Sequence, residues 1–214
     1  MINIKKIYVV ATLSIVTILT SCNLDELPKS SGSKNAVFES VNGLELYSNS
    51  FYEILPTPYD GVFLLDDHSD IIARTSVGTL LLPNGLSPIT SSGWSWSNLR
   101  NINYFIENCE TSELPEKDHF IGLARFFRAY FYFDKVKRFG NVPWIDRTID
   151  VDDEETLYGP RDDRFEVMNN ILDDLNFAIG NISTTTDSYS TRITKNVVRA
   201  FKTRVCLYEA SYRK

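Results

Sequence analysis

The sequence predicts an all-α domain, and two observations support that prediction. Five stretches of the 214-residue chain place apolar residues three or four positions apart, which is the spacing of one face of an α-helix. No stretch longer than a few residues alternates apolar and polar positions as a half-buried strand would. The composition, 43% hydrophobic and 23% charged, is that of an ordinary globular protein. We therefore expect helices that follow one another along the chain and pack as antiparallel pairs.

Residues 1–21 have the form of a secretory signal peptide. Lys5 and Lys6 precede an apolar stretch over residues 7–19, and no acidic residue occurs before Cys22. That stretch would extend only about 20 Å as a helix, less than the roughly 30 Å hydrocarbon core, so a permanent transmembrane helix is the weaker interpretation. Loss of this peptide removes lysines and no acid from a chain of net charge −6, which argues against nucleic-acid binding.

The sequence after residue 22 is expected to begin with a tether, followed by a helix and a long loop. Residues 22–34 are polar and lack an apolar period, whereas residues 35–54 have helical spacing. Residues 56–93 contain Pro or Gly at eight positions, too many for a long regular element, so we expect a loop with some ordered packing. A second helix is expected over about 94–109.

Three further elements complete the predicted domain, which spans residues 35–214. The helix expected over 117–138 has apolar residues around most of its circumference and should be nearly surrounded. Residues 140–160 are expected to form an exposed connection. Asp163 has the capping-box relation to the glutamate three residues later, and it opens a helix that continues to about residue 182. A last helix starts at Thr194 and reaches the end of the sequence without a stop signal, which suggests a truncated protein whose final apolar face is left exposed.

The end of the signal peptide is its most specific part. Leu-Thr-Ser-Cys at residues 19–22 resembles the lipobox of bacterial lipoproteins, which implies that Cys22 is acylated and anchors the chain to a membrane. Asp25 and Glu26 resemble the surface-export signal of some Gram-negative lipoproteins. The alternative is an ordinary signal peptide with a coincidental cysteine.

Several motifs together identify a family. They are LTSC at 19–22, WSNLRNINYFIEN at 96–108, ARFFRAYFYF at 124–133, RFGNVP at 138–143, Pro160-Arg161, Asp174-Leu175, Ala178, Lys195, Ala200, Lys202 and Arg204. In this order and spacing they resemble the N-terminal half of SusD/RagB-type outer-membrane lipoproteins. The resemblance implies tetratricopeptide-like helix pairs with long loops, no enzymatic activity and no cofactor. It also implies binding of a glycan or other nutrient and association with a SusC-like TonB-dependent transporter at the outer membrane.

A sugar site needs an exposed aromatic ring beside groups that hydrogen-bond hydroxyls. Trp94 and Trp96 lie at the mouth of the long loop; on an extended backbone they would point in opposite directions, so that at most one serves as a platform while the other packs inward. The candidate glycan-binding residues are Trp94, Trp96, Asp66, Asp67, Arg74 and Asn98. The alternative is that both tryptophans belong to the core and the polar residues cap turns.

Other chemistry-bearing residues receive structural interpretations. Cys109 and Cys206 lie on separate predicted helices; an exported protein could join them, but we favour free thiols. His68 and His119 lack neighbouring ligands, so no metal site is expected. The acidic residues over 150–155 are interpreted as a solvated loop rather than a calcium site. Arg125 and Arg128 are expected to pair with acids of neighbouring helices, whereas Asp173 and Asp174 are expected to face water.

Three functions compete at this stage. The first is a surface lipoprotein that captures a glycan or related nutrient for a TonB-dependent transporter. The second is a helical interaction scaffold that binds only other proteins and has no ligand site of its own. The third, a glycoside hydrolase, needs two cleft carboxylates at a defined separation, and no such pair is indicated by the sequence.

Overall fold

The computed structural model describes residues 34–57, 82–83, 93–184 and 190–214. Within these ranges every regular element is helical, and one isolated antiparallel bridge joins Val142 to Asp162. The all-α prediction is therefore confirmed. No helix in the described part of the chain is long and apolar enough to cross a bilayer. The predicted signal peptide, the lipobox cysteine Cys22 and almost all of the predicted tether lie outside the described residues.

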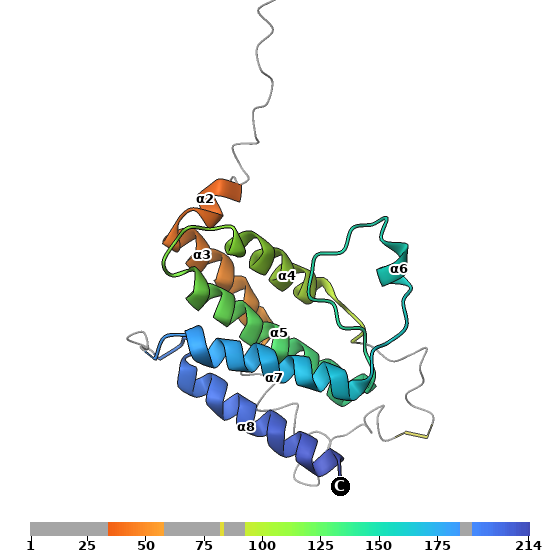
Figure 1. The fold of residues 1–214 in the computed structure, drawn as a ribbon. Helices are drawn as coiled ribbons and strands as arrows, with labels where there is room; N and C mark the ends of the chain where they lie inside the picture. The colour runs from red at the N-terminus through yellow and green to blue at the C-terminus, as the bar shows by residue number, and fades with distance from the viewer. Residues whose placement is uncertain (1–33, 58–81, 84–92, 185–189) are drawn as a thin grey trace, which may run out of the picture. The chain divides into compact units, whose positions relative to one another are not determined.

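Helix α5 (Lys117–Phe139) is the centre of the domain. It packs along α4 (Ser97–Glu110) and α7 (Arg164–Asn181), as Figure 1 shows, and its apolar side chains are buried on most sides. Tyr132 and Phe127 are among its fully buried residues. The prediction of a nearly surrounded helix is confirmed, because aromatic residues on successive turns cover several faces and each needs a neighbouring element.

The prediction of a single helix over residues 35–54 is wrong. The chain forms α2 (Lys34–Phe38), α3 (Val41–Ser48) and the 3-10 helix η1 (Asn49–Ile54) instead. Ser40 adopts an extended conformation and its hydroxyl accepts a hydrogen bond from the amide of Gly43 at 3.1 Å, which starts α3 afresh. A Cβ at Gly43 would lie 2.3 Å from the Val37 carbonyl oxygen, so this corner requires glycine.

The segment between α5 and α7 is only partly the exposed connection that was expected. Val142 is fully buried and its carbonyl accepts a hydrogen bond from the amide of Asp162 at 3.2 Å. Trp144 and Ile145 pack against the core. Further along, Asp153 accepts a hydrogen bond from the amide of Thr156 and caps the short helix α6 (Glu154–Leu157). The prediction missed these contacts because they depend on residues distant in the sequence.

The last two helices begin where the sequence predicted. Asp163 accepts a hydrogen bond from the Phe165 amide at 2.7 Å and starts α7, and Thr194 precedes α8 (Lys195–Tyr212). The expectation that the apolar face of α8 lies in water is wrong. Val205 is fully buried, and the ring of Phe201 contacts Phe126, Tyr130 and Phe133 of α5. That face therefore belongs to the core of the described domain.

Candidate functional site

Residues 93–96 lead into α4 and place the two predicted tryptophans. Gly93 has a positive φ of 94°, which favours glycine, and its carbonyl accepts a hydrogen bond from Lys135 Nζ on α5. This contact holds the start of α4 against the C-terminal half of α5. Trp96 precedes the helix with φ −121° and ψ 4°, so the backbone there is not extended.

The two tryptophan rings lie together, which corrects the expected opposite orientation. Their centroids are 5.0 Å apart and their planes meet at 81°. The prediction assumed an extended backbone with the rings on opposite sides, whereas the structure places the two rings edge to face. Trp96 packs inward against Phe131 and Tyr132, while Trp94 is 42% exposed. Trp94 is thus the ring that is available to a ligand.

Trp94 is supported from two directions. Its centroid lies 4.8 Å from that of Phe139, with planes at 89°, and 4.7 Å from the guanidinium carbon of Arg161. Aromatic and cation–π contacts of this kind each stabilise a ring position by about 0.5 to 1.5 kcal/mol. An exposed ring that is already held in place loses little side-chain entropy when a ligand binds to it.

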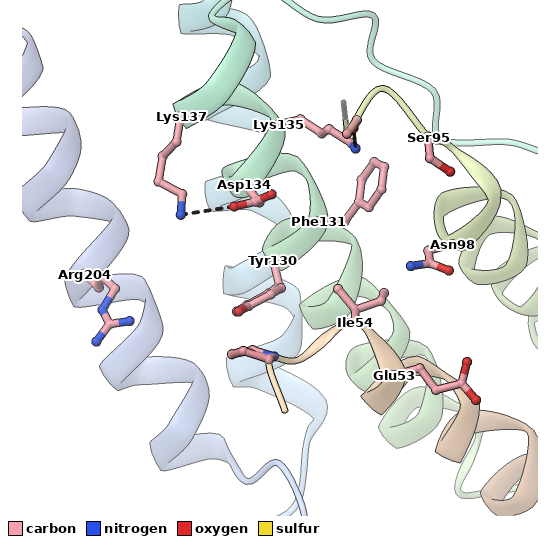
Figure 2. Close-up of a pocket in the computed structure, with 12 residues that line it drawn as sticks. Glu53, Ile54, Ser95, Asn98, Tyr130, Phe131, Asp134, Lys135, Lys137 and Arg204 are labelled. Atoms are coloured by element: carbon pink, nitrogen blue, oxygen red, sulfur yellow. Dashed lines mark hydrogen bonds and ion pairs between the residues drawn. The ribbon is translucent and has the colours of Figure 1, made fainter. Parts of the chain in front are cut away.

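Asn98, the other predicted residue that the structure describes, lines a cavity of about 600 Å³ (Figure 2). The cavity is bordered by η1, the start of α4, α5 and α8. Glu53 and Ser95 line it together with Asn98, and Arg204 of α8 reaches toward α5. These groups supply both donors and acceptors, as hydroxyl-rich ligands require.

The floor of this cavity is charged and aromatic. Tyr130, Asp134 and Lys137 of α5 recur at steps of four and three residues, so they lie on one face of the helix. Asp134 Oδ1 lies 3.3 Å from Lys137 Nζ. Burial raises the pKa of the Tyr130 hydroxyl, with a smaller contribution in the same direction from Asp134, so the phenol stays protonated as a donor at neutral pH.

Sequence reasoning missed most of the residues that line this cavity, since they come from four separate segments. The available signal was the polar Tyr130, Asp134 and Lys137 at helical spacing on a helix otherwise rich in buried aromatics. Asp66, Asp67 and Arg74 lie outside the described residues, and so does His68. Their assignment to a glycan site stays a prediction.

A buried ion cluster holds the scaffold behind the site. Arg128 donates to both carboxylate oxygens of Asp174, at 2.7 and 2.8 Å, and also to Asn103 Oδ1. Burial alone would lower the pKa of Arg128, but the hydrogen bonds and charge of Asp174 raise it. Arg125 Nε lies 3.3 Å from the same aspartate. The structural role predicted for both arginines is confirmed.

The expectation for Asp174 is wrong, because it is buried in this cluster, while Asp173 does face water. An amphipathic-helix argument cannot identify a charged residue whose partner lies 46 positions away.

The predicted free thiols are confirmed for both cysteines. Burial raises the pKa of Cys109 to about 12, so its thiol is unreactive at neutral pH.

His119 has a local structural role. Its Nδ1 accepts a hydrogen bond from the amide of Ser183 at 3.2 Å, and burial lowers the pKa of the imidazole. Within the described ranges no group of three or more His, Cys, Asp or Glu side chains could hold a metal ion.

Comparisons with known proteins agree with this architecture. A SusD-like protein of Formosa agariphila is 24% identical over 208 residues, which cover 91% of this chain and 41% of that protein. The crystal structure of a SusD-like protein from Bacteroides fragilis shares 26% identity with a TM-score of 0.63, covering 84% of this chain and 37% of that one.

A SusD-like carbohydrate binding protein from Bacteroides fragilis has the same TM-score of 0.63 at 19% identity, over 83% of this chain and 39% of that one, and it shows likeness of fold. The chain thus spans about two fifths of the length of these relatives. Residues 92–207, more than half of the chain, match the SusD-like family model described as "Starch-binding associating with outer membrane". The chain therefore belongs to the SusD-like family.

Proposed function

We propose that this chain serves as a cell-surface lipoprotein that binds a glycan or related nutrient and delivers it to a TonB-dependent outer-membrane transporter. The observation that carries the binding part is the exposed ring of Trp94, whose chain neighbours Gly93 and Ser95 line the polar cavity that contains Asn98. Acylation of Cys22 would supply the membrane anchor. The transporter and the surface location are part of the proposal, and membership of the SusD-like family supports them.

The cavity has suitable chemistry for a polyhydroxylated ligand. Its volume, about 600 Å³, lies within the range of roughly 300 to 1,000 Å³ that is usual for small-ligand sites. Asn98 and Ser95 can each donate and accept, and Arg204 can donate in a planar, bidentate manner. Trp94 would stack on the apolar face of one sugar ring, while the next ring hydrogen-bonds in the cavity.

We propose binding without hydrolysis. Glycosidases place two carboxyl groups on opposite sides of the scissile bond, one of them as the proton donor. Among the described residues, two carboxylates line the cavity, Glu53 and Asp134, and the latter already forms an ion pair with Lys137. Binding therefore suits this arrangement better than acid catalysis. Shortened products after prolonged incubation with an oligosaccharide would overturn this part.

The test is a glycan array followed by calorimetry on the purified chain. The array should include maltooligosaccharides, because the family description names starch. We expect at least one oligosaccharide to bind, and Trp94→Ala to weaken that binding while the helical circular dichroism is unchanged. Val197→Ala, an exposed substitution on α8, is the matched control and should bind as the wild type does. Lack of binding to every glycan would contradict the proposal for this chain.

A further inference from the structure

A second cavity, different in character from the first, lies beside the start of α4. It has a volume of about 310 Å³ and is formed between α4 and the segment 145–157. We call it the apolar groove. Its apolar lining residues are Trp96, Leu99, Ile145, Ile149, Val151 and Leu157.

Polar contacts among residues of its lining hold the groove open. Asn103 Nδ2 donates to the carbonyl oxygens of Ile145 at 2.9 Å and Arg147 at 3.1 Å. Arg100 donates to the carbonyl of Ile149, and Arg147 Nη2 lies 2.6 Å from Asp153 Oδ2. Because α4 and the segment are tied together at several points, the groove is formed before any partner binds.

Apolar side chains are unusually exposed at the edge of this groove. Val151 is 91% exposed and Leu157, which also lines the groove, is 50% exposed. Tyr158, next in sequence, is 84% exposed. Single exposed apolar residues are ordinary, but several around one apolar hollow are typical of a surface that another molecule covers.

The charge around the groove restricts what that molecule can be. Six of the ten residues from 146 to 155 are acidic and one is basic. Arg147 pairs with Asp153, so the acidic residues left exposed on the same segment are Asp146, Asp150, Asp152, Glu154 and Glu155. Arg100 of α4 is one further basic residue that lines the groove. An acidic rim attracts a cationic partner and repels an anionic lipid surface. The apolar lining, in turn, favours a bulky apolar side chain over a hydroxyl-rich one.

We infer that the apolar groove docks a short basic segment of another protein, inserting one bulky apolar side chain between α4 and residues 145–157 while flanking Lys or Arg residues lie against the acidic rim. This site is independent of the carbohydrate proposal, because the two cavities have different linings. Hydrophobic insertion supplies most of the affinity, and the charges supply selectivity and speed of association.

The experiment is a selection from a displayed library of random twelve-residue peptides on the purified chain. We expect enriched peptides to combine one large apolar residue with several Lys or Arg residues. A synthetic copy of the leading peptide, measured by fluorescence anisotropy, should bind Leu157→Ser about tenfold more weakly than wild type. Leu46→Ser, the same substitution at an exposed leucine of α3, is the matched control and should leave the affinity unchanged.

A second variant tests the charge. Neutralising the rim with D150N, D152N, E154Q and E155Q together should weaken the peptide about fivefold or more at low salt and remove most of the salt dependence. Neutralising four exposed acids elsewhere, with E110Q, E113Q, E166Q and D173N, should have a much smaller effect. Unchanged thermal unfolding and circular dichroism of each variant establish that it remains folded.

Three outcomes would overturn the proposal. The first is no enrichment of peptides over a selection on Leu157→Ser, and the second is enrichment of acidic or neutral peptides. The third is concentration-dependent association of the wild-type chain in sedimentation, lost in Leu157→Ser. That result would identify a second copy of this chain as the occupant.

Discussion

The first turn of α4 separates two cavities of opposite character. Asn98 lines the polar cavity, whereas its neighbours Ser97 and Leu99 line the apolar groove. Successive residues on an α-helix are rotated by about 100°, so one turn can serve two surfaces. The polar cavity and the apolar groove therefore share a scaffold, and substitutions can distinguish them only if that scaffold stays intact.

The largest expected effect comes from the shared scaffold. Asp174→Asn leaves Arg128 buried without its counter-charge, so we expect a loss of about 3 to 5 kcal/mol in the free energy of unfolding. Both cavities should be lost together, because Arg128 also binds Asn103 and the carbonyl of Asp146. Urea unfolding measures this loss. The adjacent exposed Asp173→Asn is the control and should change stability by less than about 0.5 kcal/mol; equal effects would contradict the prediction.

A substitution that loosens α8 alone should reduce stability less and should affect the two cavities differently. Arg164 Nη1 donates to Glu209 Oε1 at 2.9 Å, and Arg213 contacts the same carboxylate. We expect Glu209→Gln to lower the free energy of unfolding by about 1.5 to 3 kcal/mol. Carbohydrate binding should weaken because Arg204 of α8 borders the polar cavity, whereas the apolar groove, built from α4 and residues 145–157, should keep its peptide affinity. Loss of both the carbohydrate and the peptide affinity would contradict the prediction that the two cavities depend on different helices.

The contacts of Glu209 with Arg164 and Arg213 also predict that stability depends on pH. Burial would raise the pKa of Glu209, but hydrogen bonds from Arg164 and Arg213 lower it below its ordinary value of 4.5. A carboxyl whose pKa is depressed by folding stabilises the fold above its unfolded pKa, and this contribution is lost as the pH falls below 4.5 through the folded value. Urea titrations across that range should show a steeper loss in wild type than in Glu209→Gln. Parallel curves would contradict the assignment.

Substitution of the two tryptophans should distinguish the polar cavity from the apolar groove. Trp94→Ala removes only the exposed ring, so we expect carbohydrate binding to weaken by about 1 kcal/mol, roughly fivefold, with peptide binding unchanged. Trp96→Ala should weaken both, since Trp96 lines the apolar groove and supports Trp94. Calorimetry with the best oligosaccharide and the peptide measures both. A Trp96→Ala protein that retains full peptide affinity would show that the groove does not depend on it.

Asn98→Ala should have the smallest effect. An exposed amide exchanges a hydrogen bond to water for one to a sugar hydroxyl, so its loss should cost about 0.5 kcal/mol, roughly twofold in carbohydrate affinity. Peptide affinity should not change, because Asn98 does not line the groove. The same calorimetric pair of ligands measures this. An effect larger than that of Trp94→Ala would mean that hydrogen bonding, rather than stacking, dominates binding.

Local signals in the sequence predicted most of the helical scaffold. The structure places α5 at Lys117–Phe139 and α7 at Arg164–Asn181, within a residue or two of the predicted bounds. Both helices have long apolar periods, and Asp163 provides a cap whose chemistry is local. Such features can be read from neighbouring residues alone.

The remainder depends on contacts between distant segments. Burial of Asp174 depends on Arg128, and burial of Val142 depends on its bridge to Asp162. The relative orientation of the Trp94 and Trp96 rings depends on backbone and side-chain torsion angles that no propensity scale specifies. The polar cavity is likewise formed by side chains from four segments, of which the sequence indicated only Asn98.

The bridge between Val142 and Asp162 has a consequence for how this surface can diversify. The Val142–Asp162 bridge joins the two ends of the segment 143–161. Residues within this segment can therefore change in number without moving the ends of α5 and α7. Doubling the length of a flexible loop costs only about 0.6 kcal/mol in closure entropy. We therefore expect that changes of length in the exposed part of this segment, over residues 150–160, leave the packing of the helices beneath it unchanged.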